Sequence, residues 1–339
     1  MKQSGGQKKL VENGNIRFGL YSTPVEEINH QDYILTDPFG KKRGSLRRKS
    51  LFNQFEFLGA VSEKLIFGCA IVDLKLLSSA FVTFYDPEKK KFLAYSFKQP
   101  FASGTNLSLR PESGRAEFKK GKNHFIIEAE KGTRRLHARL ENGSSIEAEF
   151  DDGKKVEPLR ICTRAGAGWV YVRKTAAVSV QGKVECELGT FDLKKIGALG
   201  HNDWSAGYMR RDTFWNWAAL MGKLKDGKTV GLNVSCGVNE TSFTENCIWL
   251  NGTFHKVDTV DFVYDRFDVM KKWTIRSFDG NVDLEFHPET RHSENVNVLA
   301  LASNFSQMIG RFYGTLRAGR TKIQIDGLPG YAEDHFARW

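Results

Sequence analysis

The sequence predicts an all-β protein built from two antiparallel β-barrel domains in tandem. Three observations carry this prediction. Apolar and polar residues alternate with a period of two through much of the chain. The alternating runs are separated by short glycine-bearing turns, which is typical of barrels and sandwiches. A pattern of glycines and acids recurs 130 residues later, and no long segment shows the 3.6-residue apolar period of a helix.

The first half contains the clearest strands. Residues 123–130, 134–140 and 145–150 alternate between apolar and polar side chains, and the turns Lys131-Gly132 and Asn142-Gly143 separate them. The pattern predicts a meander of half-buried antiparallel strands. Two earlier apolar runs, 65–72 and 76–85, are too short and too close to charged residues for membrane helices, so we interpret them as buried strands.

The second half shows the same alternation of apolar and polar residues between turns. Val230, Leu232 and Val234 alternate with polar residues after Asp226-Gly227, and the turn signals Asn251-Gly252 and Asp279-Gly280 separate further short runs. The pattern again favours hairpins rather than helices.

An internal repeat relates the two halves. Gly189, Gly197, Gly200 and Asp203 are followed 130 residues later by Gly319, Gly327, Gly330 and Glu333. We interpret the motif as a hairpin, a tight Gly-x-x-Gly bend and a carboxylate held at a strand end. The acids could equally cap a turn or pair with an arginine at equivalent corners of two barrels. The repeat suggests an N-terminal domain of residues 1–195 and a C-terminal domain of 196–339.

Composition narrows the class of protein. The chain has 339 residues, of which 40% are hydrophobic, enough for a sizeable core. Its five cysteines are odd in number and widely spaced, which favours reduced thiols in a cytoplasm. The first ten residues are polar and resemble no signal peptide. We therefore expect a cytoplasmic protein.

One segment is strongly basic. Residues 41–49 hold six cations in nine positions, within a chain of net charge +10. We expect an exposed loop that is either only solvated or binds phosphates, for example an anionic membrane at its inner face. No aromatic-rich RNA motif or helix-turn-helix accompanies it, which argues against nucleic acid. The six residues are Lys41, Lys42, Arg43, Arg47, Arg48 and Lys49.

Potential chemistry is densest at 201–217. If 214–220 is a strand, Trp215 and Trp217 share one face and Asn216 takes the other. Two indoles on one face can line an apolar cavity or simply fill it. A carboxylic acid beside them would resist ionisation and could donate a proton. We assign that role to Asp203, with His201 as a proton relay. A His-x-Asp pair alone is weak support for a metal, and we expect none.

These residues carry a resemblance to a known family. The run from Gly168 to Val230, with HNDWSAG and FWNWAAL inside it, resembles the lipocalin-like superfamily of carotenoid 1,2-hydratase, AttH-like proteins and tocopherol cyclase. HNDWSAG, FWNWA and the terminal GYAEDHFARW are more closely similar to the domain of unknown function 2804 family. The resemblance implies two lipocalin-like barrels, a hydrophobic ligand pocket and chemistry without a cofactor. In the hydratase an aspartate protonates a carbon–carbon double bond, and Asp203 occupies the matching position. The residues around Asp203 depart from the hydratase pattern.

Two classes of function stay open. The first is a cofactor-independent enzyme that hydrates, cyclises or isomerises a hydrophobic, isoprenoid- or polyketide-like molecule by donating a proton. The second is a carrier or sensor of a lipid-like ligand. In either case we expect the ligand to contact Trp204, Tyr208, Trp215, Asn216, Trp217, Glu333 and His335. We also expect Glu333 to matter more for stability than for catalysis, because no Trp-x-Trp strand belongs to its own repeat.

Overall fold

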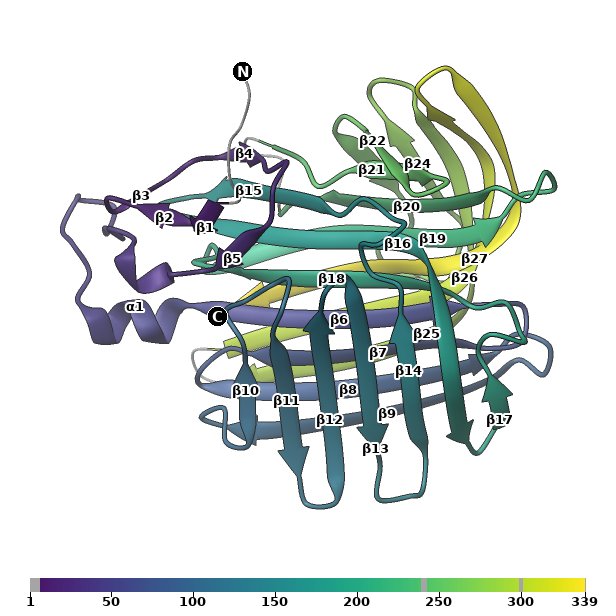
Figure 1. Ribbon diagram of the computed structural model, residues 1–339, viewed down its shortest axis with the longest axis horizontal. Coiled ribbons are helices and arrows are strands. Elements are labelled where there is room, and N and C mark those ends of the chain that lie inside the picture. The colour runs from purple at the N-terminus through teal and green to yellow at the C-terminus, as the bar shows by residue number, and fades with distance from the viewer. Residues whose placement is uncertain (1–6, 239–242, 299–300, 339) are drawn as a thin grey trace.

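The computed structural model describes residues 7–238, 243–298 and 301–338. Its helices in these ranges are the short α1 (Ser45–Leu51) and one 3-10 turn, η1 (His30–Asp32); most of the rest is strand. Two large curved sheets dominate, and Figure 1 shows the second (green to yellow) packed beside the first (blue to teal). The predicted all-β class with two antiparallel half-barrels is confirmed.

The first sheet has fourteen strands. Its main path runs β10-β11-β12-β13-β14-β16-β18-β6-β7-β8-β9. Off this path, β15 and β17 each pair with β16, and β4 pairs with β15. Its strands are β4 (Gly19–Leu20), β6 (Asn53–Val61), β7 (Ile66–Asp73), β8 (Leu77–Asp86), β9 (Lys91–Pro100), β10 (Thr105–Leu107), β11 (Arg115–Lys120), β12 (Asn123–Glu130), β13 (Thr133–Arg139), β14 (Ser145–Phe150), β15 (Leu159–Ala165), β16 (Gly168–Cys186), β17 (Gly189–Asp192) and β18 (Leu199–Gly207).

The second sheet has nine strands in the order β22-β21-β20-β19-β27-β26-β25-β24-β23. Its strands are β19 (Asp212–Lys223), β20 (Thr229–Cys236), β21 (Cys247–Leu250), β22 (Thr253–Lys256), β23 (Val260–Val263), β24 (Trp273–Ser277), β25 (Val282–Val298), β26 (Leu301–Ala318) and β27 (Thr321–Arg338). Two small ladders complete the N-terminal segment: β1 (Gln7–Lys9) lies parallel to β5 (Val25–Glu27), and β2 (Val11–Glu12) pairs with β3 (Asn15–Ile16).

The predicted strands are confirmed where the sequence alternation was clearest. The meander at 123–150 is β12, β13 and β14, and the runs at 65–72 and 76–85 fall in β7 and β8. Phe125 and Ile127 are fully buried, as are Leu232 and Val234 in the second sheet. Burial alternates along β12 as the sequence does, whereas β20 is buried on both faces along most of its length.

The internal repeat is visible in the backbone. Gly182 and Gly314 have φ of 121° and 125°, and Gly197 and Gly327 have φ of 65° and 73°. These are left-handed conformations that favour glycine. Three strands of the first sheet, β16-β18-β6, correspond in order to β26-β27-β19 of the second. The two sheets thus share one strand framework around the repeated motif.

Two details differ from the sequence interpretation. Strand β18, which we assigned to the second half, pairs with β16 and β6 of the first sheet, so the change of sheet falls between Gly207 and Asp212. The repeated acids do not lie at strand ends. Asp203 is in the middle of β18, and Gly327 is a local irregularity within the long strand β27 rather than a turn between strands. The longer ladders explain this, because pairing with β16 and β26 continues past the glycines.

The basic segment is only partly a loop. Residues 45–51 form α1, so the prediction of a loop over 41–49 is wrong in its second part. Leu, Arg and Lys are good helix formers, and they follow Gly44 there. The prediction of exposure is confirmed for Lys41, Lys42, Arg47 and Lys49. In the described residues, no helix combines the length and apolar character needed to cross a bilayer.

One sequence segment in the second sheet resembles a phosphate-binding motif. Residues 222–229, GKLKDGKT, fit the pattern G-x-x-x-x-G-K-[ST]. They form the hairpin between β19 and β20, and a strand follows the lysine where a P-loop requires a helix. The segment therefore lacks the helix N-terminus that binds phosphate.

Candidate functional site

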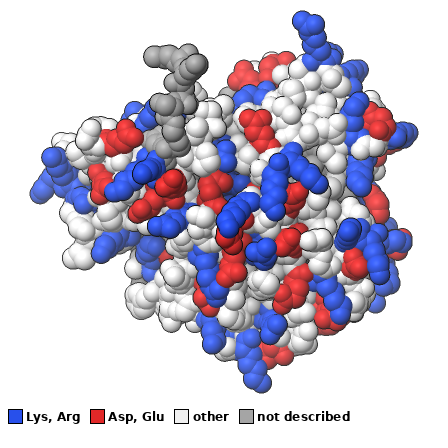
Figure 2. Space-filling view, in the orientation of Figure 1, with Lys and Arg blue, Asp and Glu red and all other residues white. Residues whose placement is uncertain are grey.

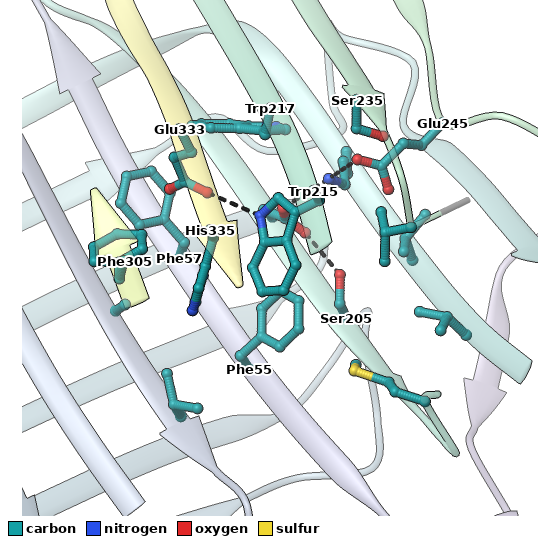
Figure 3. A pocket seen from close by; sticks show the side chains of 18 of the residues that line it. Phe55, Phe57, Ser205, Trp215, Trp217, Ser235, Glu245, Phe305, Glu333 and His335 are labelled. Atoms are coloured by element: carbon teal, nitrogen blue, oxygen red, sulfur yellow. Dashed lines mark hydrogen bonds and ion pairs between the residues drawn. The ribbon is translucent and has the colours of Figure 1, made fainter. Parts of the chain in front are cut away.

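A cavity lies between the two sheets, lined by strands of both (Figure 3). The first sheet contributes from β6, β7, β8, β16 and β18, and the second from β19, β20, β26 and β27. Most of the wall is apolar and aromatic, from Phe55, Phe57, Phe81, Trp215, Trp217 and Phe305. Such a wall with a few convergent polar groups is typical of a small-molecule site.

Asp203 lines the cavity from the first sheet, within a buried ion-paired group. Its Oδ2 accepts a hydrogen bond from Lys174 Nζ at 2.7 Å, and its Oδ1 accepts one from Ser205 Oγ at 2.8 Å. The same ammonium donates to Glu245 Oε1 at 2.6 Å. Burial opposes the charged form of Lys174, but Asp203 and Glu245 outweigh it and raise the lysine's pKa. One buried cation thus serves two carboxylates.

Glu333 lines the cavity from the second sheet, and its partners are neutral. Gln307 Nε2 donates to its Oε1 at 2.8 Å, and Trp215 Nε1 donates to its Oε2 at 3.2 Å (Figure 3). Burial raises the pKa of Glu333 to about 7, and the charge of Asp203 adds to the rise. The two hydrogen bonds and Lys174 oppose it. Glu333 can therefore hold a proton near neutral pH.

The two acids occupy equivalent positions in the two sheets. In its sheet, each acid lies between a hydrogen-bond donor on one neighbouring strand and an aromatic residue on the other. The donors are Lys174 on β16 and Gln307 on β26, and the aromatics are Phe57 on β6 and Trp217 on β19. The repeat therefore brings both of its acids to one cavity.

The correspondence continues two residues further along each strand. Ser205 lies between Val172 and Phe55, and His335 lies between Phe305 and Trp215; all six line the cavity. The His335 ring is 4.0 Å from that of Trp215, centroid to centroid, and its Nε2 is 2.9 Å from Ser303 Oγ. Burial lowers the pKa of His335 to about 3, so its ring is neutral. Its buried Nδ1 has no hydrogen-bond partner within the described residues.

The structure brings together five of the residues that the sequence singled out: Asp203, Glu333, Trp215, Trp217 and His335 all line the cavity. His201 lies one layer behind, fully buried, with its ring 5.4 Å from that of Trp217. Burial, with the charge of Lys174, lowers the pKa of His201 to about 3. The predicted shared face of Trp215 and Trp217 is confirmed.

Three of the predicted ligand-binding residues lie elsewhere. Trp204 and Tyr208 are buried in a separate aromatic cluster under the N-terminal segment, where Tyr208 Oη is 2.8 Å from His30 Nδ1. Asn216 points to the other face of β19 and donates to Tyr264 Oη at 3.0 Å. Strand alternation explains Trp204, which is one position from Asp203, and Asn216, which is one position from Trp215. Tyr208 follows the end of β18 at Gly207 and turns to the N-terminal segment.

The expectation about Glu333 rested on a wrong premise. Strand β27 pairs directly with β19, so Glu333 lies opposite Trp217 and His335 opposite Trp215. The repeat of Glu333 therefore does have a Trp-x-Trp partner strand, supplied by the same sheet.

Sequence reasoning did not find Lys174 or Glu245. Lys174 follows Arg173 within a strand that is buried on both faces, and strand alternation sends these two cations to opposite sides. Glu245 lies in the connection between β20 and β21, far from Lys174 in the chain. A lysine inside an apolar strand is a usable signal, because buried lysines are almost always paired.

Arg173 belongs to a second buried network behind the cavity wall. Its Nη1 lies 2.7 Å from Asp152 Oδ2, and its Nε lies 2.9 Å from Glu112 Oε2. Burial opposes ionisation of Asp152, but Arg173 and Arg134 outweigh it and lower the pKa of that carboxyl. Three arginines and three acids balance in charge here, which indicates a structural role. They are Arg134, Arg160, Arg173, Glu56, Glu112 and Asp152.

The described part of the chain contains no group of three or more His, Cys, Asp or Glu side chains arranged to hold a metal ion. The cavity itself combines Glu333, which holds a proton near neutrality, the ion-paired carboxylate of Asp203 and an aromatic wall.

Two curved antiparallel sheets with an apolar cavity between them define an all-β protein of two half-barrels. More specifically, the chain matches the domain of unknown function 2804 family over residues 3–339, and it belongs to that family. No curated protein matches it significantly.

Solved structures share the fold at low sequence identity. A protein assigned as AttH from Nitrosomonas europaea is 13% identical, with a TM-score of 0.53 over 83% of this chain and 91% of its own. Kievitone hydratase from Nectria haematococca is 10% identical, with a TM-score of 0.53 over 84% and 89%. CghA, crystallised with Sch210972, is 10% identical, with a TM-score of 0.50 over 98% and 97%. At these identities the similarities show a shared fold.

Proposed function

We propose that the cavity binds a hydrophobic small molecule and that the protein is a cofactor-independent enzyme which donates a proton to it from Glu333. The single observation that carries the proposal is the position of Glu333. Its carboxyl faces an aromatic cavity, has only neutral donors and has a pKa of about 7. A general acid works best when its pKa is near the operating pH.

The chemistry follows from the wall around it. A proton added to a carbon–carbon double bond creates a carbocation, which electron-rich aromatic faces such as Trp215 and Trp217 can stabilise. Water completes a hydration, an internal nucleophile completes a cyclisation, and loss of another proton completes an isomerisation. An isoprenoid- or polyketide-like substrate fits the apolar lining. The fold that this chain shares with kievitone hydratase is compatible with such a reaction.

Asp203 takes the second role in this proposal. Its carboxylate is paired with the Lys174 ammonium at 2.7 Å and lines the cavity, so we assign it to orienting the ligand and to stabilising positive charge that forms there. The proposal thus moves the acid from Asp203 to its equivalent in the repeat. His201 does not line the cavity, and we assign it a packing role beneath Trp217 rather than a relay.

A carrier or sensor of a lipid-like ligand is the second candidate. The ion pair of Asp203 with Lys174 favours it, because this carboxylate is already satisfied inside the protein. In a carrier, the polar end of the cavity would only orient the ligand.

The first experiment needs no known substrate. Glu333 accepts a hydrogen bond from the Trp215 indole, so the indole N–H resonance reports its ionisation. We expect the Trp215 signal, assigned with Trp215→Phe, to titrate with a midpoint of about 7. The titration should vanish in Glu333→Gln. A Trp215 signal that does not move between pH 5 and 9 would contradict the proposal.

The second experiment identifies and uses the ligand. Native mass spectrometry of protein purified from its host, followed by solvent extraction, reveals the bound molecule. With that molecule, Glu333→Gln should lower the turnover rate about 10²–10⁴-fold while it retains binding. Asp334→Asn is the matched control, because Asp334 is adjacent but lies on the other face of β27. Unchanged ligand recovered after long incubation with the wild type would favour the carrier.

A further inference from the structure

The end of the molecule formed by residues 37–51, here called the basic end, combines cations with exposed apolar side chains. This segment holds six lysine and arginine residues and one acid, Asp37. Two large apolar side chains stand out among these charges: Phe39 is 95% exposed and Leu46 is 83% exposed. Figure 2 shows basic side chains on the outline of the end where Figure 1 places α1.

Phe39 is held out by an ordered turn. The Asp37 N–H donates to the Lys41 carbonyl at 2.9 Å. The N–H groups of Phe39 and Lys41 donate to Asp37 Oδ1 at 3.0 and 2.9 Å. The turn therefore fixes an aromatic side chain at its tip with cations beside it. Exposed apolar residues scattered singly need no explanation, but an apolar tip flanked by lysines suits a surface that is both apolar and anionic.

Helix α1 presents the same combination. None of its residues is buried, and Arg47 and Lys49 are exposed together with Leu46. Arg48 Nη1 donates to the Arg43 carbonyl at 2.8 Å, which ties the helix to the preceding turn. Turn and helix thus form one connected unit.

The basic end adjoins the cavity. Helix α1 ends at Leu51 and β6 begins at Asn53, so cavity-lining Phe55 is four residues away, about 13 Å of extended chain. Gln54 pairs with Asp73, which brings the turn after β7 to the same edge, and Phe101 donates its N–H to the Leu76 carbonyl in that turn. Leu76 and Phe101 are 49% and 78% exposed, so the apolar surface continues along this edge.

We infer that the basic end docks on an anionic lipid bilayer, with Phe39 and Leu46 inserted at the headgroup level and the cations against lipid phosphates. Cations attracted to an anionic surface and apolar side chains buried in it reinforce each other. Docking at this end places the cavity next to the bilayer, where hydrophobic molecules are concentrated. The inference goes beyond the proposed chemistry and holds equally for a carrier.

The test is co-sedimentation with vesicles of phosphatidylcholine, with and without phosphatidylglycerol. The full-length protein should bind only the anionic vesicles, and binding should weaken as salt rises. A variant with Lys41, Lys42, Arg47 and Lys49 changed to Gln should lose about fivefold in partitioning for each charge. Phe39→Ser should weaken binding about tenfold, since its side chain would no longer enter the bilayer.

The matched control is Phe267→Ser, because Phe267 is fully exposed at a turn of the second sheet and should not contribute. Equal losses for Phe39→Ser and Phe267→Ser would overturn the inference, as would binding that salt does not affect. Binding to double-stranded DNA that is lost in the four-charge variant, without vesicle binding, would show a nucleic-acid surface instead. Direct binding of inorganic phosphate that is lost in the four-charge variant, without vesicle binding, would show a free-anion site. Neither result depends on Glu333.

Discussion

Asp203 and Glu333 occupy equivalent positions in the two sheets but meet different donors. A lysine on the neighbouring strand pairs with Asp203, and a glutamine on the equivalent strand pairs with Glu333. The distances are alike, 2.7 and 2.8 Å, so the difference is one of charge rather than geometry. A duplicated framework can therefore hold an ion-paired carboxylate and a protonatable carboxyl side by side.

The aromatic neighbours differ in a complementary way. Phe57 on β6 lies opposite Asp203, and Trp217 on β19 lies opposite Glu333. Two residues away on the same strands, Phe55 and Trp215 also occupy equivalent positions. Both indoles donate a hydrogen bond, which a phenyl ring cannot do: Trp215 donates to Glu333, and Trp217 donates to Asn233 at 2.8 Å. The second sheet thus surrounds its acid with neutral donors, and the first sheet relies on the ammonium of Lys174.

The largest expected effect comes from removing that ammonium. Lys174→Gln leaves Asp203 and Glu245 buried without their cation, so we expect a loss of about 3–5 kcal/mol in the free energy of unfolding, measured by urea denaturation. Lys271→Gln is the control, since Lys271 pairs with Asp265 at 2.7 Å on the exposed surface and should cost less than about 1 kcal/mol. Similar losses for both variants would show that Lys174 is not the cation on which the first half-site depends.

The second prediction concerns stability against pH. The folded protein holds the Glu333 proton up to about pH 7, whereas an unfolded glutamate releases it near 4.5. At this residue the unfolded state therefore binds fewer protons across the window, so the contribution of Glu333 to the stability of the wild type falls as pH rises from about 4.5 to about 7. Glu333→Gln removes this loss, so its advantage should grow to as much as about 3 kcal/mol at pH 8.

Urea denaturation at several pH values measures this difference, and the exposed residue change Glu26→Gln provides the control. The difference between Glu26→Gln and the wild type should stay flat. A Glu333→Gln advantage that is independent of pH would mean that the gain comes from packing and not from a buried charge.

Much of the fold was predictable because it depends on local chemistry. The meander at 123–150 could be identified from its alternation and its glycine turns, and the repeat from glycines that need left-handed backbone. The sheet to which 199–207 belongs could not, since strand pairing is decided by contacts with β6, far earlier in the chain. The short α1 was missed because its charges indicated exposure and not backbone conformation.

Some features of the candidate site could likewise be predicted from the sequence, and others could not. Trp215 and Trp217 could be placed on one face from strand alternation alone, and Asp203 was correctly directed toward a cavity. Its partner could not be identified, because Lys174 is brought to Asp203 by pairing of β16 with β18 and Glu245 by the packing of the second sheet. The partners of each acid come from distant parts of the chain, so the sequence alone favoured Asp203 as the proton donor, whereas our proposal, which includes these partners, favours Glu333.

The third prediction gives Glu333 the kind of donor that Asp203 has. Gln307→Lys places a cation beside Glu333, as Lys174 is beside Asp203, and should lower the pKa of Glu333 from about 7 by one to two units, or about 1.4–2.7 kcal/mol. The Trp215 indole titration measures the shift. Gln307→Met is the control, because it removes the hydrogen bond without adding charge and should not lower the midpoint. A midpoint that stays at 7 in Gln307→Lys would mean that neighbouring charge does not set the difference between the two acids.

The smallest expected effect lies at the next pair of equivalent positions, two residues before the acids. His201 and Tyr331 are both fully buried, but only Tyr331 reaches across to the other sheet, where its hydroxyl donates to the Phe67 carbonyl at 2.7 Å. Gly59 makes room for it, since a Cβ there would lie 2.9 Å from the hydroxyl oxygen.

Tyr331→Phe should therefore cost about 1 kcal/mol in the free energy of unfolding, because a buried carbonyl loses its donor while the ring packing is kept. Urea denaturation measures this cost against Tyr95→Phe, whose hydroxyl binds Glu187 in an exposed position and should change stability by less than about 0.5 kcal/mol. Equal effects of the two substitutions would show that this hydrogen bond does not help hold the two sheets together, and would leave that role to apolar packing and to the Lys174–Glu245 ion pair.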